Sequence, residues 1–302
     1  MRWAAGPGQQ PEPYRPPPPP AKSGGGCLKV VLVMLGGSFL LCCCILSAVV
    51  ESAKDPLDWQ AVVPATDSAS LGVALMPSDL SPEGARHYSW RQAFAKWELG
   101  YGVSTDVHTQ VEDDFADMSE RYSYKSGKGN NFTWAPPSAC FKREWQCVFD
   151  ELVRDNEDDI APLTELFRRK QQEQNLDARQ VTELVVSFVQ NITYRLPTEE
   201  TAAFGMLPPV IVVADGSGDC DSKALLAVVI LRQLNVDAVV LLASGLGHAA
   251  LGVGLPVTGK KFAYQGKKYA FVEVTTPGWA LGAMAPEYDV DKAWKVIPVT
   301  VR

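Results

Sequence analysis

The stretch GDCDSKALLAVVILRQLNVDAVVLL, residues 218–242, is the most informative part of the chain for its fold. Residues 221–234 within it follow a helical pattern that is apolar almost all round, which predicts a helix buried on every side. Residues 238–243 then form a continuous apolar run of strand length. A buried helix that leads directly into a strand predicts a core that contains both helices and strands.

Sequence patterns on both sides extend this core. Further strands are expected at 249–253 and 268–275, and an amphipathic helix at 178–190 ends a helical lead-in that begins near 139. The acidic run at 155–159 interrupts this lead-in. It lacks the Gly and terminal Glu of an EF-hand loop, so we interpret it as a solvated junction between helices rather than a calcium site. The predicted domain covers residues 138–302, with its core at about 175–285.

Cys220 is the only cysteine of this C-terminal core, and His248 is its only histidine. Cys220 follows the turn 216–219 and opens the buried helix, where the partial positive charge of a helix N-terminus lowers a thiol pKa. The backbone N–H of Cys220 has no partner within the helix and is also free to bind an oxyanion. The position therefore suits a nucleophile.

His248 and Glu273 supply the other groups that a thiol enzyme needs. His248 stands at a predicted strand start and can act as the base, while Glu273 is the only acid in the apolar strand YAFVEVT and can orient the imidazole. Each residue alone has an ordinary structural explanation. The order Cys, His, acid, with separations of 28 and 25 residues, predicts a catalytic triad.

Three blocks resemble the transglutaminase-like core of the papain-like cysteine-protease superfamily: residues 218–242, GHAALGV at 247–253 and YAFVEVTTPGWALG at 269–282. FVQNITY, residues 188–194, is similar to the segment that precedes the nucleophile in bacterial members. The resemblance implies an α+β fold in which a helix bearing the nucleophile packs on an antiparallel sheet. It also implies that Cys220 is the nucleophile, His248 the base and Glu273 the orienting acid, where Asp is commonest in the family.

The resemblance further implies a polar or aromatic oxyanion donor upstream of the nucleophile. Gln190 and Tyr194 are the candidates, although a helix-end polar residue and a core aromatic residue explain them equally well. Asp219 and Asp221 are expected to cap the helix, because Asp is favoured at and near an N-cap. We expect no metal and no other cofactor, since the chain has neither a CxxC nor an HxxxH pair.

The N-terminal region does not belong to a globular core. Residues 1–26 hold a run of prolines that predicts a disordered tail, which we interpret as a solvated spacer; a proline-binding partner is the alternative. Residues 30–50 contain no charged residue, and as a helix they would be about 31 Å long. We therefore predict a transmembrane helix at 27–50, rather than a cleaved signal peptide or a buried helix.

The charges that flank this apolar segment predict its orientation. Basic residues precede it and acidic residues follow it, so the N-terminus is expected in the cytoplasm and residues 51–302 outside it. Residues 51–86 are rich in proline and predict a linker with at most one short strand. The alternation of Trp97, Leu99 and Tyr101 predicts a β-hairpin within a β-rich segment at 87–137.

Cys140 and Cys147 lie on either side of a predicted helix start at the beginning of the lead-in. In the oxidising compartment that the predicted topology implies, they can form a disulfide, and two buried thiols are the alternative. Cys220 is expected to remain unpaired.

Charge excludes one class of partner. Residues 1–29 carry +3 and the rest of the chain −10, so the body has no basic footprint for nucleic acid. The sequence predicts a single-pass, membrane-anchored bacterial-type thiol enzyme that cleaves peptide or amide bonds of a protein or peptide substrate through a thioester. We expect hydrolysis rather than crosslinking. The alternative is a non-catalytic module of the same fold that binds peptides or serves as an envelope scaffold.

Overall fold

The computed structural model describes residues 68–76, 85–92, 95–126, 132–196 and 203–302. All of them belong to the compact unit that contains Asp67–Arg302. The predicted tail (1–26), the predicted transmembrane helix (27–50) and most of the predicted linker (51–86) lie outside the described residues. Among the helices within these ranges, none combines the length and the apolar character needed to span a bilayer.

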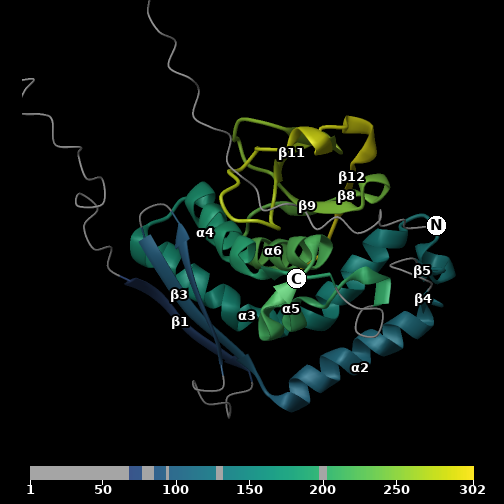
Figure 1. Cartoon of the computed structure of the whole chain (residues 1–302), viewed down its shortest axis with the longest axis horizontal. Helices are drawn as coiled ribbons and strands as arrows, with labels where there is room; N and C mark the ends of the chain where they lie inside the picture. The colour runs from purple at the N-terminus through teal and green to yellow at the C-terminus, as the bar shows by residue number, and fades with distance from the viewer. Residues whose placement is uncertain (1–67, 77–84, 93–94, 127–131, 197–202) are drawn as a thin grey trace, which may run out of the picture. The chain divides into compact units, whose positions relative to one another are not determined.

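The described unit has a mixed α+β fold, and its largest sheet is antiparallel throughout (Figure 1). The five strands lie in the order β10-β11-β9-β8-β12. They are β8 (Ala238–Ala243), β9 (His248–Val253), β10 (Lys261–Tyr264), β11 (Lys267–Val272) and β12 (Lys295–Pro298). The strand predicted at 238–243 is present, and the strand predicted at 268–275 ends three residues earlier, at Val272.

Helix α6 (Cys220–Gln233) lies between this sheet and three other helices (Figure 1). These helices are α3 (Glu144–Gln174), α4 (Ala178–Asn191) and α5 (Pro209–Asp215). Every side chain from Ala224 to Leu231 is 0% exposed, because α6 has neighbours on all sides. Full burial of a Leu or Val side chain contributes about 1.5–3 kcal/mol, so this helix is the main apolar support of the fold.

Helix α3 continues without a break through the acidic run 155–159, so the predicted junction between helices is wrong. Two residues of the run are buried and bonded. The Asn156 side-chain carbonyl accepts a hydrogen bond from the Val210 backbone N–H at 3.2 Å, and the Glu157 backbone carbonyl accepts one from the Gln233 amide at 2.8 Å. The other acids of the run face outward to varying degrees, which hides the helical period in the sequence.

A second sheet, of order β1-β3-β2, precedes α3. Strands β2 (Arg86–Gln92) and β3 (Ala95–Val103) form the antiparallel hairpin that the alternation predicts. Strand β1 (Ser68–Met76) pairs parallel to β3, so the end of the segment predicted as a linker is part of a sheet. The prolines that indicated a linker lie outside this strand, at Pro64 and Pro77 among other positions.

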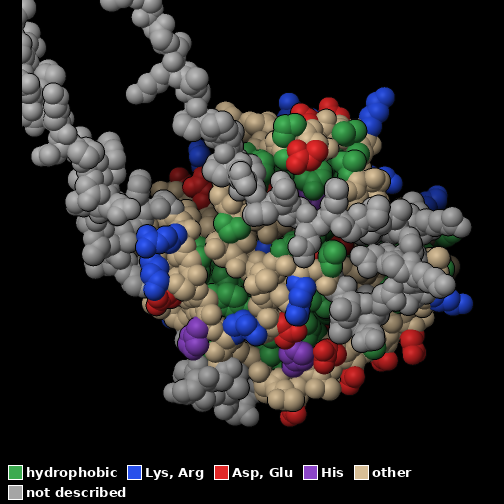
Figure 2. Space-filling view, viewed as in Figure 1, with side chains coloured by type: hydrophobic (Ala, Val, Ile, Leu, Met, Phe, Trp, Pro, Cys, Tyr) green, Lys and Arg blue, Asp and Glu red, His purple; other side chains and the backbone are tan. Residues whose placement is uncertain are grey.

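Residues 105–121 of the predicted β-rich segment form helix α2 (Thr105–Arg121), so that prediction is wrong for this part. The helix buries only a narrow stripe, Val111, Phe115 and Met118. Acidic side chains gather along its outer face (Figure 2). Because so few apolar residues recur at helical spacing, the sequence did not predict this helix.

The hairpin is joined to the helices by long side chains. The Trp90 ring N–H donates to the Ser187 hydroxyl at 2.9 Å, the Arg86 Nε donates to the Ala214 carbonyl at 2.6 Å, and the Tyr88 hydroxyl donates to the Val213 carbonyl. The described residues of the predicted segment 87–137 therefore belong to the same compact unit as those of the predicted domain 138–302. The structure joins Cys140 and Cys147 in a disulfide, whereas Cys220 is free.

Short elements complete the described unit. The strand pairs are β4 (Lys125–Ser126) with β5 (Phe132–Thr133), and β6 (Thr193–Tyr194) with β7 (Ser217–Gly218). The 3-10 turns are η2 (Ser138–Cys140), η3 (Ala203–Gly205), η4 (Ser244–Leu246), η5 (Pro286–Tyr288) and η6 (Asp291–Ala293). Two of these elements end shortly before residues predicted for the site: β7 before Cys220 and η4 before His248. Strand β6 contains Tyr194, and η5 contains Tyr288.

Candidate active site

Cys220 is the first residue of α6, as the sequence predicts. The chain enters the helix from β7, which pairs with β6 and thereby places Tyr194 opposite Gly218. Asp219 is the N-cap, and its carboxylate accepts from the backbone N–H of Ser222 at 3.3 Å. The cap predicted from the residue type is confirmed for Asp219, and it fixes the direction in which the helix starts.

The start of α6 meets the start of β9. The backbone N–H of Ala249 bonds the Cys220 thiol, and His248, the residue before it, is the first residue of β9. Cys220 is 3% exposed and His248 is 6% exposed. The nucleophile and the base predicted from the sequence therefore lie on adjoining elements in a buried place.

Glu273 follows β11 directly and bonds the imidazole: His248 Nε2 lies 2.9 Å from Glu273 Oε2. Thr275 donates twice to the other carboxylate oxygen, Oε1, from its backbone N–H at 2.8 Å and from its hydroxyl at 2.6 Å. Burial alone would raise the pKa of Glu273, but the bonds from His248 and Thr275 outweigh it and hold the pKa at about 2. An ionised Glu273 accepts from Nε2, which leaves Nδ1 to exchange a proton with a thiol.

This low pKa predicts how folding stability depends on acid. A carboxylate whose pKa falls from 4.5 to about 2 on folding contributes about 3 kcal/mol above pH 4.5, and that contribution is lost as the pH falls toward 2. Urea unfolding of the wild type and of Glu273→Gln should therefore differ more at pH 6 than at pH 2.5. An equal difference at both pH values would contradict the assignment of this charge.

Gln190 and Tyr194, the two oxyanion candidates, have different surroundings. The Gln190 amide is buried and donates to the backbone carbonyls of Glu273 at 2.8 Å and Trp279 at 3.0 Å. Both N–H groups of the amide are therefore already bonded to backbone carbonyls. The Tyr194 side chain is 39% exposed. Its pKa is raised, first by burial and then by the nearby charge of Cys220, so its hydroxyl stays protonated as a donor. Tyr194 fits the role of an oxyanion donor better than Gln190.

Two aromatic residues that the sequence did not single out cover the imidazole. The ring of Tyr288 stacks on His248 with the centroids 4.2 Å apart and the planes 19° apart, and Trp294 meets His248 edge to face at 5.9 Å. Both come from the segment after the triad, where the sequence offers no motif to single them out. These two rings and the burial of Cys220 leave the thiol and the imidazole with little access to solvent.

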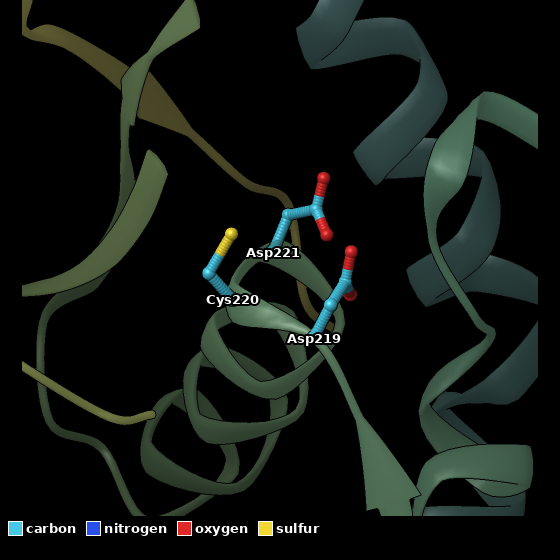
Figure 3. A group of neighbouring side chains, drawn as sticks. All are labelled: Asp219, Cys220 and Asp221. Carbon is cyan, nitrogen blue, oxygen red and sulfur yellow. The ribbon is translucent and has the colours of Figure 1, made fainter. Parts of the chain in front are cut away.

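The pKa of the Cys220 thiol is raised, so the prediction of a lowered pKa is wrong. Burial is the largest cause, followed by the charges of Asp221 and Asp219, which together outweigh the bond from the Ala249 N–H. Figure 3 shows the two carboxyl groups side by side, on a different side of the helix start from the sulfur. The pKa of Asp221 is also raised, first by burial and then by the charge of Asp219.

Asp219, Cys220 and Asp221 are also the described group whose ligand atoms lie close enough together, within 4.8 Å, to hold a metal ion. Their atoms already have other partners. Asp219 accepts from the Ser222 backbone N–H and hydroxyl, and its carboxyl bonds that of Asp221. These contacts fit a helix cap rather than a metal site.

Lys223 is a third residue near the site that the sequence analysis does not name. It is 0% exposed and lies one turn after Cys220 on α6. A signal was present in the sequence, because a lysine inside a helix that is apolar all round must itself be buried.

The comparisons with known proteins assign no family to this chain: no protein-family model, no curated protein and no solved structure matches it.

Proposed function

We propose that this chain is a thiol enzyme of the transglutaminase-like type that acts on peptide or amide bonds through Cys220, His248 and Glu273. The observation that carries the proposal is the bond of 2.9 Å between His248 and Glu273, formed where the thiol-bearing start of α6 meets β9. A buried imidazole held by an ionised carboxylate is the arrangement that orients a general base. The helix packed on an antiparallel sheet supports the papain-like fold that the sequence resembles.

In the proposed reaction, His248 Nδ1 takes the proton of the Cys220 thiol as the sulfur attacks the substrate carbonyl carbon. The backbone N–H groups at the start of α6 and the Tyr194 hydroxyl stabilise the oxyanion. The imidazolium then gives its proton to the leaving amine, the C–N bond breaks and a thioester remains. Water attacks the thioester in hydrolysis, and a second amine attacks it in crosslinking; in either case the C–S bond breaks, the acid or amide leaves, and the sulfur of Cys220 regains a proton. We propose hydrolysis. No metal or cofactor is needed for these steps.

We further propose that the enzyme is anchored by the apolar residues 27–50 and that the described unit lies outside the cytoplasm. The Cys140–Cys147 disulfide supports this location, since disulfides persist in oxidising compartments. A protein or peptide outside the membrane is then the substrate, and the acidic outer face of α2 gives no support for a nucleic-acid partner.

An active ester tests the chemistry without knowledge of the natural substrate. Incubation with p-nitrophenyl acetate is expected to add one acetyl group at Cys220, detected by peptide mass mapping, and Cys220→Ala should not be acetylated there. His248→Gln should slow acylation by about 100-fold or more, because the general base is lost. His108→Gln is the matched control, since His108 lies on α2 and pairs with Glu112 and Asp215. Equal acylation in His248→Gln and the wild type would refute the proposal.

The deep burial of Cys220 favours a second candidate, a non-catalytic peptide-binding or envelope scaffold module on the same fold. A thiol that is 3% exposed and has a raised pKa is also what a structural cysteine shows. If this candidate is correct, the ester will not acylate Cys220 in a His248-dependent way. Cys220→Ala will then retain the biological phenotype.

A further inference from the structure

Lys223 places a charged side chain in the most apolar part of the unit. It lies one turn beyond Cys220 on α6, and it is 0% exposed. A buried ammonium is costly unless hydrogen bonds compensate it. Its contacts therefore indicate what the structure gains from it.

The Lys223 ammonium bonds three backbone carbonyls, those of Ile192 at 2.7 Å, Thr275 at 3.1 Å and Gln190 at 3.3 Å. Two of these carbonyls lie at the end of α4, and the third lies just after β11. An ammonium has three N–H donors, so each carbonyl receives one, whereas a neutral amine would leave one carbonyl unpaired. Lys223 thus ties α4 and the segment after β11 to the helix that carries the thiol.

Two routes lead from Lys223 to Glu273. In the first, Lys223 holds the carbonyl of Thr275, whose backbone N–H and hydroxyl both donate to the Glu273 carboxylate. In the second, Lys223 holds the carbonyl of Gln190, whose side-chain amide donates to the backbone carbonyl of Glu273. Both routes end on the residue that bonds His248.

We propose that Lys223 is the positioning residue of this site, which aligns the Glu273 carboxylate with His248 by fixing Thr275 and Gln190 against α6. It touches no substrate in this role, and its effect on rate presupposes the proposed acyl chemistry. Its charge has a second effect, because a positive group one turn from Cys220 favours the thiolate as it forms.

The pKa of Lys223 lies near neutral pH. Burial lowers its pKa to about 7, while the charges of Glu273, at the end of β11, and of Cys220, on its own helix, favour the ammonium. The three carbonyls also require the ammonium, so deprotonation would release one of the contacts described above.

The test measures the His248–Glu273 bond as well as the rate. A buried imidazole N–H that donates to a carboxylate gives a slowly exchanging proton resonance far downfield, and its absence from His248→Gln assigns it. Lys223→Met is expected to lose or shift this resonance and to slow acylation by p-nitrophenyl acetate about 30-fold or more. Lys223→Arg, which keeps the charge and the donors, should restore part of both. The control Lys268→Met replaces an exposed lysine of β11 and should change neither.

A folded Lys223→Met protein with an unchanged resonance and a rate within threefold of the wild type overturns the proposal. If Lys223→Met does not fold, Thr275→Val replaces it, because this change keeps the Thr275 carbonyl and removes only the hydroxyl that bonds Glu273. We expect a shifted resonance and about a 10-fold slower rate, and no change in either overturns the proposed route. If the wild type is not acylated at all, the proposed function fails, while the resonance still tests the role of Lys223.

Discussion

In the Glu273→Gln variant, acylation of Cys220 by p-nitrophenyl acetate is expected to be about 10³-fold slower than in the wild type. This loss of rate is larger than the removal of one hydrogen bond would cause. The reason is the placement of Thr275. Its backbone N–H and hydroxyl both donate to the Oε1 position, so the amide oxygen of the substituted side chain must take that position. The amide nitrogen then faces His248 Nε2 and donates to it, which forces the imidazole proton onto Nδ1. A protonated Nδ1 cannot accept the thiol proton.

The rate of acetylation by p-nitrophenyl acetate, measured by mass spectrometry, checks this expectation. Glu273→Asp is the matched control, because it keeps an acceptor-only group and shortens the side chain by one methylene. It should retain more activity than Glu273→Gln, even though its bond to His248 is longer. A Glu273→Gln rate equal to that of the wild type would show that Glu273 does not set the tautomer.

Gly282→Ala is expected to lower the free energy of unfolding by about 4 kcal/mol or more. Two backbone segments cross at this glycine: the Gly282 N–H donates to the Phe271 carbonyl at 2.7 Å, and its carbonyl accepts from the Lys260 N–H at 2.9 Å. A Cβ at position 282 would lie 2.0 Å from the Thr258 carbonyl oxygen, and φ is +84°. Because the obstacle is backbone, no rotamer change relieves it.

Gly278→Ala is the control for Gly282→Ala. Gly278 has φ +95°, also in the left-handed region, but a Cβ there has no neighbour within 4 Å. It should cost only about 1–2 kcal/mol, the penalty of the backbone conformation alone. Urea unfolding of both variants separates the two effects, and equal losses would mean that the backbone crossing is not tight. Gly282→Ala should also disturb Tyr288, six residues later, and so expose His248.

The residues of the proposed triad could be singled out from the sequence because they stand out in their local context. Cys220 follows a flexible turn and opens a helix, and Glu273 is the only acid in an apolar strand. The sequence also predicts that Glu273 orients His248. What could not be predicted is the strand register that places Val272 opposite Leu251 and brings the two side chains to 2.9 Å, because it depends on how two separate strands pair.

The raised thiol pKa could not be predicted either, for a related reason. The partial charge of a helix N-terminus is local, but burial comes from segments distant in the sequence, and Tyr288 lies 68 residues after Cys220. Helix α2 and the continuity of α3 were missed because charged residues outnumber the apolar ones that define the buried face. Lys223 is different. Its burial could be predicted from the apolar helix around it, but the three carbonyls that it bonds could not.

The coverage of Cys220 has a consequence for its chemical lifetime. Oxidation by peroxide and exchange with small disulfides both need an accessible thiolate, and this sulfur is 3% exposed with a raised pKa. If the proposed function and location hold, this burial protects a cysteine that must stay reduced in an oxidising compartment. Each opening that admitted a substrate would then also admit oxidants, so the fraction of time spent open would limit both the turnover of the proposed enzyme and the survival of its thiol.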